Sequence, residues 1–259
     1  MRALSEIWWI LALLAVGSYL IGSLNFSIII SKKKGNDIRG MGSGNPGMMN
    51  MSRNFGLKTG ALILALDMFK GALPTFIGMI VFRNVRFTGT DFYISDMAKY
   101  LCGFFAVLGH VFPFYLKFKG GKGISTTIGV SLVAYPLVGF ISGVIGLIFI
   151  LITSVGSMGS LICITPPAIA AEIHLFLKYV YDAGSGLFIA GKEEILLPLI
   201  LTSVFVVGIC ALSWFAHRKN IKALVCGEEH LTTWSAMLKK AVRKRRAARA
   251  GDDAENIAK

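Results

Sequence analysis

The stretch GISTTIGVSLVAYPLVGFISGVIGLIFILIT, residues 123–153, decides the fold. Its 31 residues contain no charged side chain. A helix needs about 20 apolar residues to cross the hydrocarbon core of a membrane, so the stretch is either one tilted helix or two shorter segments. In the second case the break is expected at Tyr135–Pro136, because proline disfavours helical geometry at the residue before it. Both interpretations place the stretch inside a membrane.

The composition of the whole chain is typical of a membrane protein. Hydrophobic residues make up 54% of the 259 residues and charged residues only 16%, whereas soluble domains carry about 25% charged residues. These values exclude both a soluble globular chain and a disordered one. The net charge of +13 suits anionic lipid or an anionic substrate. The four cysteines form no CxxC pair, so we expect neither a disulfide framework nor a zinc site.

Five further apolar runs are long enough to cross a membrane, and a charged or aromatic residue lies near most of their ends. They are Ile7–Ile30, Phe55–Phe82, Met97–Leu116, Met158–Val180 and Glu194–Ala216. The first run is too long for the hydrophobic part of a typical signal peptide, and no small-residue cleavage site precedes the lysines that follow it. We therefore interpret it as a permanent helix.

The lysines and arginines predict the topology. They concentrate after the first run, after Met97–Leu116 and in the tail from Arg218 onward, and the positive-inside rule places all three regions in the cytosol. The tail returns to that side only if an even number of crossings follows Lys122, which requires two helices within residues 123–153. We predict an all-α polytopic membrane protein with about seven transmembrane helices, its N-terminus outside and its C-terminus cytosolic.

The chain is expected to form one integral-membrane domain over residues 1–238, followed by a basic, alanine-rich cytosolic tail over residues 239–259. The basic block Lys239–Arg249 suits an anionic lipid surface better than nucleic acid, because juxtamembrane lysines and arginines are attracted to anionic headgroups.

Three polar clusters are not needed to span a membrane, and all lie on the predicted cytosolic side. The first is Gly42-Ser43-Gly44-Asn45-Pro46-Gly47, continued by Asn50 and Arg53. Glycines allow turns in which successive N–H groups converge on an anion. The guanidinium of Arg53 can make two parallel hydrogen bonds to a phosphate. The alternative is an ordinary flexible loop.

The second cluster runs from His110 to Thr127 and contains the loop Lys119-Gly120-Gly121-Lys122-Gly123, with Thr126 just beyond it. Bare N–H groups, a lysine ammonium and a helix N-terminus all favour a phosphate. The loop is not a Walker A motif, because Gly123 stands where that motif needs serine or threonine. His110 is either part of this site or an interfacial histidine with a structural role.

The third cluster is His217-Arg218-Lys219-Asn220-Ile221-Lys222, followed by Gly227 and Glu229, and it could also be a charged helix end at the membrane surface. Asp67 and Lys70 form a further pair inside an apolar run. Ionisable residues inside a membrane cost about 2.5–3.5 kcal/mol each on insertion scales, so this pair has either a functional or a structural purpose.

The order and spelling of these clusters resemble the bacterial acyl-phosphate:glycerol-3-phosphate acyltransferase (PlsY) family over about residues 7–230. The family signatures are matched by Gly42 to Arg53, by Asp67, Lys70, Gly71 and Pro74, by Gly109 to Gly123, and by His217, Asn220, Ile221, Lys222, Leu224, Gly227 and Glu229. The chain departs from the family where Ser154 and Ala223 replace common arginines and where Met48-Met49 replaces the usual Ala-Thr. The basic tail is also additional.

The resemblance implies transfer of a fatty acyl group from acyl phosphate to the 1-hydroxyl of glycerol 3-phosphate, giving lysophosphatidic acid and phosphate. This would be the first acylation step of phospholipid synthesis, in a bacterial cytoplasmic membrane with the active site facing the cytosol. No metal, cofactor or nucleic acid is expected; the partners are the two substrates and membrane lipid, and the protein is expected to work as a monomer.

The predicted site residues fall into two groups. The catalytic group is Ser43, Arg53, Lys122, His217 and Asn220. The substrate-binding group is Gly44, Asn45, Asn50, Lys70, His110, Lys119, Gly120, Gly121, Gly123, Thr126 and Glu229.

The residues also fit this reaction on chemical grounds. Both substrates carry a phosphate, and the chain has two separate glycine-rich loops with cations. No His-x4-Asp dyad of the soluble-type glycerolipid acyltransferases is present, so the acceptor proton is expected to pass to the donor phosphate. One alternative is an organic-phosphate permease, which would need inverted repeats and polar groups near the membrane midplane. Another is a membrane anchor for a cytosolic partner, which would leave the clusters unexplained.

Overall fold

The structure is a computed structural model that describes residues 1–181 and 193–228. Its α-helices are α1 Leu4–Ser23, α2 Phe26–Lys33, α3 Met48–Phe55, α4 Leu57–Val81, α5 Ile94–Val111, α6 Ile124–Ala134, α7 Pro136–Thr153, α8 Gly156–Tyr179, α9 Glu193–Ala216 and α10 Arg218–Val225. Two 3-10 segments, η1 Ile38–Gly40 and η2 Phe114–Leu116, lie in loops. Glu229 and the predicted tail, residues 239–259, lie outside the described residues.

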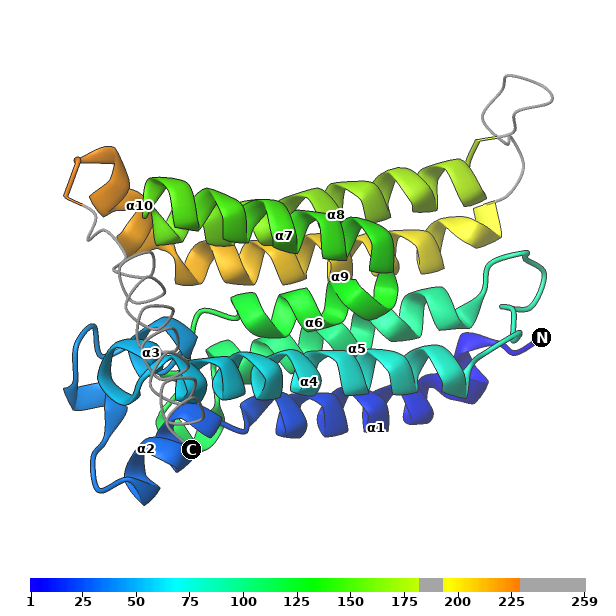
Figure 1. Ribbon diagram of the computed structural model, residues 1–259. Coiled ribbons are helices and arrows are strands. Elements are labelled where there is room, and N and C mark those ends of the chain that lie inside the picture. Colours follow the sequence, from blue (N-terminus) through cyan, green and yellow to red (C-terminus); the bar gives the residue numbers. More distant parts are fainter. Residues whose placement is uncertain (182–192, 229–259) are drawn as a thin grey trace, which may run out of the picture.

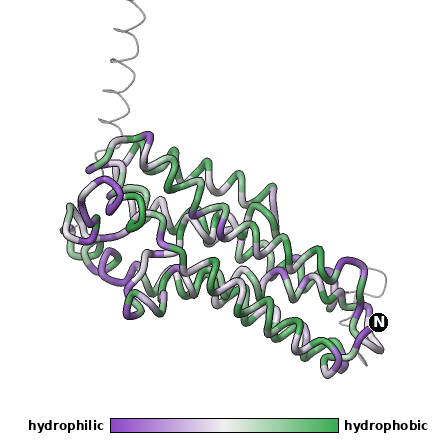
Figure 2. Tube along the Cα trace, turned by 90° about the horizontal axis from the view of Figure 1, so that it is seen from below, coloured by the Kyte–Doolittle hydropathy of each residue, from purple (hydrophilic) through white to green (hydrophobic). Residues whose placement is uncertain are grey.

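The long helices run side by side along one axis (Figure 1). Helices α1, α4, α5 and α6 form one group and α7, α8 and α9 a second, joined where α5 packs against α9 and α6 against α8. Six helical segments within the described residues are long and apolar enough to cross a membrane. Hydrophobic positions follow the length of the bundle, and hydrophilic positions gather toward its ends (Figure 2). The chain is an all-α integral membrane protein, as predicted.

Residues 123–153 form two helices, which is the second of the two arrangements considered from the sequence. Helix α6 ends at Ala134, Tyr135 separates the two helices, and α7 begins at Pro136. Proline suits this first helical position, because its missing N–H has no partner there in any helix. With 11 residues α6 is about 16 Å long, roughly half of the hydrocarbon core. Figure 1 shows the chain turning back into α7 before it reaches the far end of the bundle.

The first apolar run is not one helix, as had been expected of Ile7–Ile30, but is broken at Leu24–Asn25. The side chain of Asn25 accepts a hydrogen bond from the Ile28 N–H, at 3.1 Å, and so begins a new helix, α2. The hydroxyl of Tyr115 donates to the Ser23 carbonyl and accepts from the Asn25 N–H. These partners satisfy the backbone groups that the break leaves free.

Glycines set the closest helix pairs of the bundle. A methyl group on Gly71 of α4 would overlap the backbone of Thr126 on α6, and one on Gly129 of α6 would overlap the backbone of Met68 on α4. Small residues allow helix backbones to approach in this way inside a membrane. The start of α6, which directly follows the loop Lys119 to Gly123, is therefore held tightly against α4.

The N-terminus and α10 lie at opposite ends of the bundle (Figure 1). A chain that crosses a membrane an odd number of times has its two ends on opposite sides, so this arrangement agrees with an odd number of crossings. The number of crossings and the side on which each terminus lies stay predictions.

Candidate active site

The described residues of the three polar clusters lie at one end of the bundle. Helices α2, α3 and α10 and the loop between α5 and α6 all lie at this end (Figure 1). An apolar cluster built on Ile38 and Met51 includes Met41 and Leu116, so the first glycine-rich loop packs beside the loop that follows α5. Ile221 of α10 and Ile124 at the start of α6 both pack against one apolar cluster on α8, formed by Leu161, Cys163 and Ile164. The structure thus brings together segments far apart in sequence.

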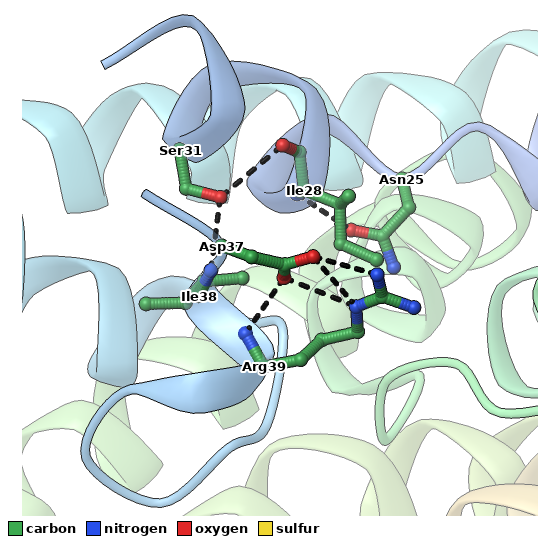
Figure 3. Close-up of polar contacts among 6 residues, drawn as sticks. All are labelled: Asn25, Ile28, Ser31, Asp37, Ile38 and Arg39. Carbon is green, nitrogen blue, oxygen red and sulfur yellow. Dashed lines mark hydrogen bonds and ion pairs between the residues drawn. The ribbon is translucent and has the colours of Figure 1, made fainter. Parts of the chain in front are cut away.

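A set of short polar contacts joins the end of α2 to the chain that leads into the first loop (Figure 3). The hydroxyl of Ser31 donates to the Ile28 carbonyl and accepts from the Ile38 N–H, each at 3.1 Å. The Asp37 carboxylate accepts from the Arg39 backbone N–H and from its guanidinium, with Nη2 at 2.6 Å. These hydrogen bonds hold the pKa of Asp37 near 2, so the pair stays charged at neutral pH. The chain entering the glycine-rich loop is therefore fixed.

Asn50 shapes the first loop from inside. Its side-chain oxygen accepts from the Ser43 N–H at 3.2 Å, and its side-chain nitrogen donates to the Met41 carbonyl at 2.9 Å. Gly42 and Gly44 have φ of +55° and +69°, the left-handed region that favours glycine. The amide of Asn50 is thus used within the loop, while the side chains of Ser43 and Arg53 are exposed. The loop presents a hydroxyl and a guanidinium at its surface.

The second loop folds back on the end of α5. The N–H groups of Gly120 and Gly121 donate to the carbonyls of Val111 and His110, at 3.0 and 3.1 Å. A methyl group at either glycine would overlap His110, its carbonyl in one case and its ring nitrogen Nε2 in the other. Gly123, with φ of +84°, begins α6. Glycine is required here because the backbone lies directly against the histidine.

A buried ion pair connects this histidine to the start of α2. The Lys70 ammonium lies 2.9 Å from the Asp67 carboxylate and donates to the Leu24 carbonyl at 2.7 Å. Nδ1 of His110 lies 3.9 Å from the same carboxylate and 3.1 Å from the Thr126 hydroxyl. The side chains of Lys70 and Asp67 are only 2% and 4% exposed. The structure gives Lys70 partners inside the bundle, and a direct phosphate contact by Lys70 stays a prediction.

We expect the variant Lys70→Met to fold poorly, because it leaves Asp67 buried without its partner, at a cost of about 3–5 kcal/mol. The double variant Asp67→Asn/Lys70→Met should recover most of the thermal stability, because it removes both buried charges, and it keeps acyl transfer only where the pair serves the fold and not the substrate. Thermal unfolding and activity of the purified variants measure both. A double variant that is folded and inactive would instead show that the Asp67–Lys70 pair serves the reaction as well as the fold.

His217, at the end of α9, is oriented by the turn that precedes it. Its Nδ1–H donates to the Ser213 carbonyl at 2.8 Å, and the Ser213 hydroxyl lies 3.2 Å from the Thr127 hydroxyl on α6. Burial lowers the pKa of His217 to about 4, and the ammonium of Lys122 acts in the same direction. The imidazole is therefore neutral at pH 7, with Nε2 as a hydrogen-bond acceptor.

This pKa predicts a loss of stability in acid. The unfolded chain takes up a proton at His217 below its ordinary value of 6.5, whereas the folded chain does so only near pH 4. Between these two pH values, each unit by which the pH falls lowers the free energy of unfolding by at most about 1.4 kcal/mol. Above pH 6.5 His217 is neutral in both states and has no such effect. The thermal midpoint of wild type should fall across this window more steeply than that of His217→Gln. Identical slopes would contradict the assignment.

The remaining predicted residues are placed as follows. Asn45, Lys122 and Asn220 are half-buried, Lys119 is exposed, and Thr126 is fully buried against His110. Glu229 lies outside the described residues. The sequence analysis missed Ser213 and Thr127, which position His217 and the loop. Ser213 stands four residues before His217 in a helix, a spacing that places both on one face.

Known proteins resemble this chain over most of its length. A family model described as Glycerol-3-phosphate acyltransferase matches residues 12–227. The Glycerol-3-phosphate acyltransferase of Aquifex aeolicus (strain VF5) is 35% identical over 218 residues, which are 84% of this chain and 96% of that one. The protein of the same name from Bacillus subtilis (strain 168) is 34% identical over 226 residues, 87% and 99% of the two chains.

Two solved structures share the fold. One is PlsY (YgiH), an integral membrane glycerol 3-phosphate acyltransferase, in its glycerol 3-phosphate form. It is 30% identical, with a TM-score of 0.66, and the match covers 88% of this chain and 98% of that one. The lysophosphatidic acid form of that protein has a TM-score of 0.64 and covers 85% and 94%.

Proposed function

Because this chain belongs to the glycerol-3-phosphate acyltransferase family, we propose that it transfers a fatty acyl group from acyl phosphate to the 1-hydroxyl of glycerol 3-phosphate. The products are lysophosphatidic acid and inorganic phosphate. The observation that carries the proposal is that two glycine-rich loops, one followed by Arg53 and the other containing Lys122, lie at one end of an apolar bundle, where Met41 and Leu116 share an apolar cluster. Two phosphate-bearing substrates, one of them with a lipid tail, fit such a site.

Acyl transfer from an acyl phosphate needs the two substrates to be aligned and their negative charge to be neutralised. In the reaction the acceptor oxygen bonds to the acyl carbon, the bond from that carbon to the phosphate oxygen breaks, and the hydroxyl proton passes to the departing phosphate. An acyl phosphate is already activated, so holding the two substrates in line and neutralising their phosphates supplies most of the catalysis. We assign the glycine loop around Gly121 and Gly123 to the acyl phosphate, with Lys122 shared between both anions.

The acceptor is assigned to the other residues of the site. Ser43 and Arg53 bind the phosphate of glycerol 3-phosphate, together with Asn220. His217 is neutral and its Nδ1–H is already bonded to Ser213, so its Nε2 can accept a hydrogen bond from a glycerol hydroxyl. This role orients the nucleophile, and the donor phosphate still receives the proton.

We further propose that the protein works as a monomer in a bacterial cytoplasmic membrane, with this site facing the cytosol. The many lysines and arginines at this end of the bundle support the orientation. The same clustering disfavours a phosphate permease, whose polar groups would lie near the midplane.

The test is acyl transfer by the purified full chain. Incubation with acyl phosphate and labelled glycerol 3-phosphate should give labelled lysophosphatidic acid and an equal amount of phosphate. Replacement of acyl phosphate by acyl-CoA is the control and should give no product. Product from acyl-CoA, or none from acyl phosphate, would refute the proposed donor.

A further inference from the structure

One histidine holds both ends of the segment from Gly121 to Thr126, which contains Lys122 and Gly123 of the second glycine-rich loop. The N–H of Gly121 donates to the His110 carbonyl at 3.1 Å. The chain then turns into α6, where the hydroxyl of Thr126 lies 3.1 Å from Nδ1 of the same histidine. The segment therefore leaves His110 through a backbone hydrogen bond and returns to it through a side chain.

His110 and Thr126 lie behind the loop and not at its surface. The side chain of His110 is 5% exposed, and Thr126 is fully buried. On the loop itself, Lys119 is exposed and Lys122 is half-buried. A phosphate bound by this loop therefore meets its lysines and its backbone, and not the histidine or the threonine.

The surroundings of His110 also raise the alternative of a general base. The Asp67 carboxylate lies 3.9 Å from Nδ1, and an imidazole with a carboxylate beside one nitrogen can take up a proton at the other. That other nitrogen, Nε2, faces Gly121, because a methyl group on this glycine would lie 2.2 Å from it. The backbone of the loop thus occupies the space that a reacting hydroxyl would need.

The start of α6 shows what the histidine positions. Its first backbone hydrogen bond runs from the Thr127 N–H to the Gly123 carbonyl at 2.8 Å, so the N–H groups of residues 124–126 have no partner within the helix. Such groups, with a lysine beside them, attract an anion. Their direction depends on how the chain enters the helix, and the contact between Thr126 and His110 fixes this entry.

We propose that His110 and Thr126 are positioning residues for the acyl phosphate: they fix the shape of the loop that binds its phosphate and touch neither substrate. The inference rests on the proposed function, which assigns this loop to the donor. It refines the roles expected from the sequence, where both residues were grouped with the substrate ligands. A phosphate bound by backbone N–H groups is placed only as precisely as the chain that carries them, and a displacement of about 1 Å can cost about 100-fold in rate.

Removal of the Thr126 hydroxyl tests this. In Thr126→Val the side chain keeps its shape, but Nδ1 of His110 is left buried without that partner, and the loss of such a hydrogen bond corresponds to about 5- to 150-fold. The KM for acyl phosphate should rise within this range, while the KM for glycerol 3-phosphate stays unchanged. Thr126→Ser retains the hydroxyl and should keep most of the wild-type value. Because KM does not depend on the amount of folded enzyme, a general loss of stability would not give this result.

The matched control is Thr202→Val. Thr202 is also fully buried, and its hydroxyl donates to the Pro198 carbonyl at 2.7 Å, about 20 Å along α9 from the end of that helix at Ala216. This variant should leave both KM values at those of wild type. An unchanged KM for acyl phosphate in Thr126→Val, or an equal rise in both KM values, would overturn the proposal.

His110→Asn separates positioning from general base catalysis, and it decides the question if Thr126→Val fails to fold. Asparagine places a polar atom near the position of Nδ1 but has no group that takes up a proton. If His110 only positions the loop, this variant keeps the pH dependence of kcat of wild type, and its defect lies in the KM for acyl phosphate. A kcat that is lost together with that pH dependence identifies a general base and overturns the proposal. A wild type that uses no acyl phosphate refutes the proposed function itself, before any variant is compared.

Discussion

Replacement of Arg53 by alanine is expected to remove nearly all acyl transfer, and replacement by lysine most of it. The guanidinium can form two parallel hydrogen bonds to phosphate, whereas an ammonium acts as a point charge. Each charge-assisted hydrogen bond contributes about 1.5–3 kcal/mol, so the loss of one lowers kcat/KM for glycerol 3-phosphate by about 10- to 150-fold. Arg53 is exposed on α3, beside the loop that Asn50 braces, so the substitution leaves the fold intact.

The control for charge alone is Lys33→Ala, at the end of α2. Lys33 is exposed and lies at the same end of the bundle, but outside the predicted site. If Arg53 served only to mark the cytosolic side, lysine would replace it without effect. Wild-type activity in Arg53→Lys would therefore exclude Arg53 from the site.

The second large effect is expected from Gly121→Ala. A methyl group here would overlap Nε2 of His110, a buried ring that is already bonded to Thr126 and close to Asp67. Because the histidine has no room to move, the loop must shift instead. Displacement of a reacting group by about 1 Å can cost about 100-fold in rate, so we expect kcat/KM for acyl phosphate to fall by that order, or activity to be lost.

Gly143→Ala is the matched control for this substitution. Gly143 lies in α7, and a methyl group there meets no atom within 4 Å. Steady-state kinetics with acyl phosphate as the varied substrate should show no change in this variant. A fully active Gly121→Ala enzyme with an unchanged KM for acyl phosphate would contradict the assignment of the loop to the donor.

Periodicity and charge predicted much of the architecture. The break at Tyr135–Pro136 follows from two local facts, the geometry that proline imposes and the side on which the lysines must lie. The break at Leu24–Asn25 was not predicted, because hydropathy averages over about a helix length and hides one asparagine. Asn25 ends the first helix only because Tyr115 and Lys70, distant in sequence, bind the backbone groups that it frees.

For the candidate site too, the sequence predicts one part and only the packing of the helices shows the other. The residue types that suit phosphate, in Gly42 to Arg53 and in Lys119 to Gly123, are evident from the sequence, because glycines and cations in such runs have no use in spanning a membrane. Substrate binding by Lys70 stays a prediction, and only the structure shows that its ammonium has the Asp67 carboxylate and the Leu24 carbonyl as partners inside the bundle. A sequence states which groups can be charged, and only packing decides which of them face each other.

By itself, then, the sequence determined that the chain is helical and spans a membrane, where its lysines and arginines concentrate along the chain, and which family it resembles. Local preferences decide these features, because hydrophobicity, proline and charge act over a few neighbouring residues. The tertiary structure decided that His110 lies against Gly121 and that the Ser213 carbonyl holds the ring of His217. The first contact depends on how the loop after α5 folds back on that helix, and the second on where α9 ends, so neither follows from local preferences alone.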